Sequence, residues 1–378
     1  MRIGKSWLIF FVIGILVIGG LIFIFVQKPK ENQSPYISSS AATTSTISVA
    51  STTTSPMLPL QVLLNDNYYV PQTFNNCGPA ALSMDLSFYG VNVTQEALAD
   101  ILRPDHNTTG HNDEKSTPPE DIAAQAESYG PIAYYRPAGN IDLLKQLVAA
   151  GFPVLVRTLF MPTDEVAHYR VITGYNDATA TPVIIDEDGF QGPNVMYSDA
   201  DFMSLWKYYN YEYIVLASPS QVPVLDGILG NDVDAPTAWQ DAKNIAANDI
   251  AQNSSDYLAT FNLSVADYYL GDYASSTQAF ESVETLIPPN TLWYQIEPIE
   301  SYYELGQYDK VYSLSETVFE QGNIAVPELH VLRGESDEKE GNLADAKNEF
   351  ETALFYNKNL QSAQDALDAL VASSTNAQ

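Results

Sequence analysis

Residues 70–82 read VPQTFNNCGPAAL, and they contain the only cysteine of this 378-residue chain. The run from Gly78 to Tyr89 predicts a helix, because Pro79 suits a first turn and Gly90 can end it. Cys77 then lies at the mouth of that helix, where the helix dipole and unpaired backbone N–H groups favour a thiolate. The competing interpretation is a small buried apolar side chain, which is the common state of a lone cysteine.

A thiol nucleophile needs an imidazole that takes its proton and later protonates the leaving group. Of the four histidines, His168 directly precedes an apolar strand, residues 169–175 (YRVITGY). Asp186 ends the next predicted strand, eighteen residues later, and is suited to orient the imidazole ring. Gln72, five residues before the cysteine, can supply an amide to an oxyanion. The predicted site is therefore Gln72, Cys77, His168 and Asp186.

Four stretches together resemble the bacteriocin-processing, double-glycine type of papain-like cysteine peptidase, in its non-transporter branch. They are QTFNNCGPAAL, TPPEDIAAQAESYG, AAGFPVLVRT and HYRVITGY followed by VIID. The resemblance implies a lobe of helices, a lobe of antiparallel sheet, and a cleft between them. It implies that Cys77, His168 and Asp186 form the triad, with Asp188 as the alternative third member, and that Gln72 forms the oxyanion hole. The chain has no Walker-type glycine loop, so the family's transporter role does not carry over.

The chain divides into segments by composition. Residues 7–26 are a twenty-residue run without a charge, long enough to cross roughly 30 Å of hydrocarbon, and follow a short flank, 1–6. We interpret them as an uncleaved membrane anchor, the alternative being a cleaved signal peptide. Residues 27–58 are Ser/Thr-rich and predict a disordered stalk. The other segments expected are a papain-like α+β domain at 59–218, a Pro/Gly/Asp-rich connector at 219–255, helical repeats at 256–370 and a disordered tail at 371–378.

Three glycines mark a repeat in the C-terminal part. Gly271, Gly306 and Gly341 are each 35 residues apart, and each follows a helix-like run. A helix-turn-helix unit of about this length resembles the tetratricopeptide repeat, whose stacked helix pairs form a concave groove that binds a peptide or protein segment. The alternative is an irregular helical bundle with glycines at ordinary turns.

Charge and side-chain type limit the partners. The formal charge of −30 repels phosphate backbones, which excludes nucleic acid as an expected partner. His106, His111 and Asp113 are interpreted as residues of a solvated loop and not as a metal site, because Asn, Thr and Gly surround them. No cofactor is expected.

The sequence therefore predicts a membrane-anchored cysteine peptidase, single-pass, with its soluble part on the extracytoplasmic side. Its substrate is a peptide or protein, and its repeats recruit a peptide or protein partner. Two alternatives stay open: a non-catalytic scaffold that binds proteins, and a thiol transpeptidase or amidase that acts on cell-wall peptides.

Overall fold

The computed structural model describes residues 57–65, 67–105, 114, 117–162 and 164–376. All of them belong to one compact unit, residues 56–378. The expected anchor at 7–26, nearly all of the expected stalk and the loop with His106, His111 and Asp113 lie outside the described residues. Within the described part of the chain, no helix is long and apolar enough to span a bilayer.

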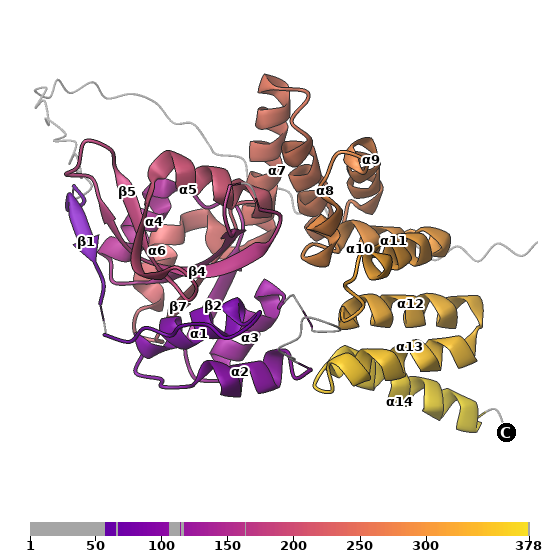
Figure 1. Ribbon diagram of the computed structural model, residues 1–378. Coiled ribbons are helices and arrows are strands. Elements are labelled where there is room, and N and C mark those ends of the chain that lie inside the picture. The colour runs from indigo at the N-terminus through magenta and orange to yellow at the C-terminus, as the bar shows by residue number, and fades with distance from the viewer. Residues whose placement is uncertain (1–56, 66, 106–113, 115–116, 163, 377–378) are drawn as a thin grey trace, which may run out of the picture. The chain divides into compact units, whose positions relative to one another are not determined.

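One antiparallel sheet of seven strands organises the first part of the unit (Figure 1). Its strand order is β2-β7-β3-β4-β5-β6, and β1 pairs with β4 beside β3. The strands are β1 (Gln61–Leu63), β2 (Ile132–Arg136), β3 (Val154–Leu159), β4 (Ala167–Asn176), β5 (Val183–Asp188), β6 (Gly192–Ser198) and β7 (Tyr213–Ala217).

Helices cover both faces of this sheet. Side chains alternate between the two faces along each strand, so apolar side chains of one strand pack against helices on both sides. In β7, Ile214 and Leu216 pack against α1 (Cys77–Ser87), α2 (Gln95–Leu102) and α3 (Pro119–Glu127). Val215 and Ala217 face the opposite way, toward α4 (Ile141–Ala149), α5 (Asp199–Trp206) and α6 (Val222–Leu229). The expected α+β architecture is therefore present, and the helix predicted from Gly78 to Tyr89 lies close to its expected bounds as α1.

The segment expected to be a turn-rich connector is mostly helical, which corrects that prediction. It contains α6, the short 3₁₀ helix η2 (Gly230–Val233) and α7 (Ala235–Gln252). Prolines near the start of α6 and α7 are compatible with a first helical turn, where no intrahelical N–H bond is lost. Leu225 and Leu229, one turn apart, enter the sheet core, so apolar spacing outweighed the Pro and Gly content.

Helices alone make up the C-terminal part. Three consecutive helical hairpins turn at Gly271, Gly306 and Gly341, whose positive φ angles of 75°, 70° and 84° suit glycine. The hairpins are α8 (Tyr257–Tyr269) with α9 (Tyr273–Val283), α10 (Glu297–Glu304) with α11 (Tyr308–Glu320), and α12 (Pro327–Glu340) with α13 (Leu343–Tyr356). The 3₁₀ helix η3 (Pro289–Trp293) precedes α10, and α14 (Gln361–Asn376) extends into the expected tail, which is therefore helical to residue 376.

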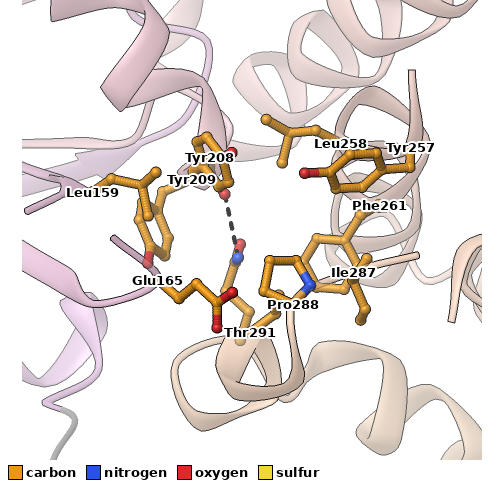
Figure 2. Close-up of a pocket in the computed structure, with 11 residues that line it drawn as sticks. Leu159, Glu165, Tyr208, Tyr209, Tyr257, Leu258, Phe261, Ile287, Pro288 and Thr291 are labelled. Carbon is orange, nitrogen blue, oxygen red and sulfur yellow. Dashed lines mark hydrogen bonds between the residues drawn. The ribbon is translucent and has the colours of Figure 1, made fainter. Parts of the chain in front are cut away.

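The helical part packs directly on the sheet domain (Figure 2). Leu159 at the end of β3 and Tyr209 of the 3₁₀ helix η1 (Lys207–Tyr209) face Phe261 of α8 across a cavity of only about 20 Å³. Gln295 donates from Nε2 to the carbonyl of Tyr208 over 3.3 Å, and Asn262 donates to the carbonyl of Lys207 over 2.7 Å. Apolar contact and hydrogen bonds thus bring the segment before α10 to the end of the sheet.

Candidate active site

Cys77 is the first residue of α1, and a bonded turn fixes its position. The backbone N–H of Asn76 donates to the carbonyl of Thr73, and the Asn76 side chain accepts from Nη1 of Arg103 at 2.9 Å. Arg103 is itself buried, and it also donates to the carbonyl of Glu114. The turn therefore presents the half-buried Cys77 thiol at the positive end of the helix.

His168 faces Cys77 from the second residue of β4. The ring is 3% exposed and makes an edge contact with Phe160, with ring centroids 5.0 Å apart. Both His168 and Cys77 line one open cleft of about 440 Å³, and the imidazole is near enough to the thiol for each group to shift the pKa of the other. Imidazole and sulfur from segments about ninety residues apart thus meet in the same cleft.

Asp188, and not Asp186, contacts the imidazole. Its Oδ1 lies 3.0 Å from Nε2 of His168, and the same oxygen accepts from the backbone N–H groups of Phe190 and Gln191 at 2.8 and 2.9 Å. This contact engages Nε2, so Nδ1 is the ring nitrogen left for the thiol. The contact with Asp188 therefore also fixes the orientation of the ring.

Asp186 instead accepts from Nη1 of Arg170 at 3.2 Å, so the expectation that it contacts His168 is wrong. The reason is the antiparallel register of β4 and β5, in which Asp186 pairs with Ile172. Moving back along β4 from Ile172 toward His168 means moving forward along β5, from Asp186 toward Asp188. Asp188, which the sequence offered as the alternative, is the residue that the register brings to the ring.

The electrostatics of the Cys77–His168 pair favour a negative thiol and a positive imidazole. Burial raises the pKa of the Cys77 thiol, but the hydrogen bond and positive charge of His168 outweigh it, and the net pKa is lowered. Burial lowers the pKa of His168, but bonds to Asp188 and Cys77 raise it to about 9. Asp188 is buried, which raises its pKa, yet His168 and Arg170 bring it down to about 2. Both shifts favour a thiolate beside an imidazolium over the neutral pair.

Gln72 lines the same cleft as Cys77 and His168. Its backbone N–H donates to the carbonyl of Gly189 over 2.8 Å, which anchors the strand-like segment before the cysteine to the β5–β6 turn. The buried side-chain Oε1 has no hydrogen-bond partner among the described residues. The Gln72 side chain therefore shares the cleft with the thiol and is uncommitted on its acceptor side.

Tyr294 is a cleft residue that the sequence did not indicate. It follows η3 in the helical part, yet it lines the cleft together with Cys77 and His168. Its carbonyl accepts from Nη1 of Arg157 at 2.9 Å, and Arg157 is held by an ion pair with Glu212 at 2.6 Å. No local signal marks Tyr294, because its contact with the cleft depends on how the helical part packs on the sheet.

The chain is similar to a known protein family over part of its length. Residues 63–214 match the family model described as "Peptidase_C39 like family". No curated protein matches the chain significantly.

Three solved structures are similar to part of the chain. One is a C39-like peptidase from Bacillus anthracis, with 17% identity and a TM-score of 0.34 over 42% of this chain and 98% of that one. Another is the peptidase domain of Streptococcus ComA, a bi-functional ABC transporter involved in a quorum sensing pathway, with 22% identity and a TM-score of 0.31 over 39% of this chain and 96% of that one. The third is MamA MSR-1 C2, with 16% identity and a TM-score of 0.32 over 36% of this chain and 78% of that one.

These scores are low, so the assignment rests on the family model, which spans the strand-and-helix core and contains Gln72, Cys77, His168 and Asp188. Over residues 63–214, this chain is similar to the peptidase C39-like family.

Proposed function

We propose that this protein is a cysteine peptidase in which Cys77 is the nucleophile, His168 the general acid and base, and Asp188 the residue that orients the imidazole. The observation that carries the proposal is that Cys77 and His168 line the same cleft, while the Asp188 carboxylate is hydrogen-bonded to the His168 imidazole. A thiol and an imidazole in one accessible cleft, with a buried carboxylate bonded to the imidazole, match the requirements of thiol-dependent acyl transfer.

The reaction follows from the charges. The Cys77 thiolate attacks the carbonyl carbon of a peptide bond, and the carbonyl oxygen takes up the negative charge. The backbone N–H of Cys77 and the amide of Gln72 stabilise that oxyanion. His168 then gives its proton to the leaving amine, so that the C–N bond breaks and an acyl-enzyme remains. Water attacks this thioester while His168 takes up its proton, which releases the acid and restores the thiolate.

Hydrolysis of a peptide library by the full-length chain tests the proposal. Mass spectrometry should detect new peptide termini with the wild-type protein, and Cys77→Ser should reduce their rate of formation by about a thousandfold or more. Ser87→Ala, at the far end of the same helix, serves as the matched control and should keep the wild-type rate. Absence of any cleavage that depends on Cys77 would contradict the proposal and favour a binding role.

The accessory segments extend this function. We propose that the apolar run 7–26 anchors the chain in a membrane with its soluble part on the extracytoplasmic side, and that the helical hairpins recruit a peptide or protein. The run's length supports the first point. The three hairpins at one 35-residue spacing support the second. Protease accessibility of the chain in intact cells tests the orientation, and cleavage of the soluble part from outside is the expected result.

A further inference from the structure

A second cavity, of about 420 Å³, lies between α3 of the sheet domain and the helical part. Carboxylates from three helices line it, and at neutral pH their mutual repulsion is costly unless a cation is present. The carboxylates belong to Glu120, Asp121, Glu297, Glu300 and Glu328. We call this space the acidic cavity.

Positive charge is scarce around the acidic cavity. Arg157 is the one cation among the described residues that line it, and its charge is offset by the ion pair with Glu212 at 2.6 Å. Glu297 is 6% exposed, and its Oε2 has no hydrogen-bond partner in the described part of the chain. Its other oxygen, Oε1, is 3.4 Å from the hydroxyl of Tyr269. A nearly buried acceptor is therefore left unsatisfied at the wall of a cavity large enough for a side chain.

The chemistry of the walls favours an organic cation over a metal ion. No group of three or more His, Cys, Asp or Glu side chains in the described residues is arranged to hold a metal. Aromatic rings stand beside the carboxylates and offer π faces to a guanidinium or ammonium group. The aromatic rings belong to Tyr268, Tyr269, Trp293 and Tyr294. Carboxylates and aromatic faces together are what recognise an arginine or lysine side chain.

The acidic cavity adjoins the cleft of Cys77. Arg157 and Tyr294 line it and also line a small space of about 10 Å³ beside Cys77. Tyr294 lines the catalytic cleft as well. The two sites thus share a wall, so a peptide bound at the thiol would lie next to the acidic cavity.

We infer that the acidic cavity binds the cationic side chain of an arginine or lysine residue in the peptide substrate. That the bound peptide is the substrate rests on the proposed peptidase function, whereas the binding of the cation does not. The inference gives the helical part a role in selecting basic peptides.

Binding to the full-length Cys77→Ala chain tests this inference without requiring turnover. The probes are two fluorophore-labelled pentapeptides, acetyl-AARAA-amide and the same peptide with citrulline, the uncharged isostere, in place of arginine. Fluorescence anisotropy should give a Kd at least about tenfold lower for the arginine peptide, which corresponds to one charge-assisted hydrogen bond.

Two further variants in the Cys77→Ala background locate the effect. Glu297→Gln combined with Glu300→Gln should reduce the preference for arginine to less than about twofold, while the exposed Glu320→Gln should leave it unchanged. Circular dichroism verifies that the double variant is folded. Equal affinity for the two peptides, or a preference that survives the double substitution, would overturn the inference and leave the peptidase proposal intact. If no Cys77-dependent cleavage is found but the preference for the arginine peptide is, the peptidase proposal is contradicted and the binding inference stands.

Discussion

The Oδ1 atom of Asp188 lies 3.0 Å from Nε2 of His168, while Asp186, two residues earlier on the same strand, accepts from Arg170. The two carboxylates are both fully buried, but their surroundings move their pKa values apart. Burial raises the pKa of Asp186 to about 7 despite the nearby Arg170, whereas His168 holds the pKa of Asp188 at about 2 against the effect of burial. Only Asp188 is firmly charged at neutral pH beside the imidazole.

The two carboxylates should therefore respond differently to neutral substitution. Asp188→Asn removes the charge that supports the imidazolium, and it should lower kcat/KM about a hundredfold or more. Asp186→Asn removes a partner of the buried Arg170, so it should lower the free energy of unfolding more than it lowers kcat/KM. Peptide hydrolysis and urea denaturation measure the two effects. A larger loss of kcat/KM in Asp186→Asn would assign the orienting role to that residue instead.

Activity should depend on pH through the ion pair. The reactive form needs a deprotonated Cys77, whose pKa is lowered by His168, and a protonated His168, whose pKa is raised to about 9. The profile of kcat/KM should rise at acidic pH, below the usual range of a free thiol, and fall as the pH passes about 9. In Asp188→Asn the alkaline limb should move to lower pH, because the imidazolium loses its supporting charge. An alkaline limb that stays near pH 9 in this variant would show that Asp188 does not support the imidazolium.

Tyr294 should affect substrate binding more than chemistry. It lines the cleft but has no hydrogen bond to His168 or Asp188 among the described residues, so Tyr294→Ala should raise KM about three- to tenfold with a smaller change in kcat. The matched control is Phe355→Ala, since this aromatic residue of α13 is 71% exposed. Steady-state kinetics on one cleaved peptide measures both variants. If KM is the same in both, the helical part does not take part in forming the cleft.

The acidic cavity should make folding stability depend on pH. Burial raises the pKa of Asp121 to about 6 and those of Glu300 and Glu328 to about 7, so the folded chain holds protons that the unfolded chain releases. For a folded-state pKa above the unfolded value, the stabilising contribution is present at low pH and is lost as the pH rises through the folded pKa. The free energy of unfolding should thus decrease between about pH 5 and pH 8.

Urea denaturation at both pH values measures this decrease, and Glu297→Gln combined with Glu300→Gln should make it smaller. The exposed Glu320→Gln is the control and should behave like the wild-type chain. An unchanged pH dependence in the double variant would show that these carboxyls are not protonated in the folded protein.

The sequence indicated the residue types of the site better than their pairing. Cys77 was identified by its place before a helix, His168 by its place before an apolar strand, and the structure brings both into one cleft. The choice between Asp186 and Asp188 depended on the register of β4 and β5, and a shift of two residues changes which carboxylate reaches the ring. Residue spacing along one strand cannot supply that register, since it is set by pairing with another strand.

Other features depended on packing across long sequence separations. The connector was expected to be irregular because of its Pro and Gly content, but Leu225 and Leu229 pack into the sheet core and hold α6 in place. Tyr294 reaches the cleft because the helical part packs on the sheet, where Arg157 of β3 bonds its carbonyl across 137 residues of sequence. Local propensity carries no information about such contacts.

Alkylation of Cys77 tests the central claim most directly, because it is the only cysteine of the chain and a thiol reagent reports this site alone. The rate of reaction with iodoacetamide, measured on the folded full-length chain from pH 5 to pH 10, gives the pKa of the thiol. An activated thiolate predicts rapid labelling near pH 6.5 and a rate at least about tenfold lower at that pH in His168→Ala. Labelling that follows the pH dependence of an ordinary free thiol in both proteins would contradict the account.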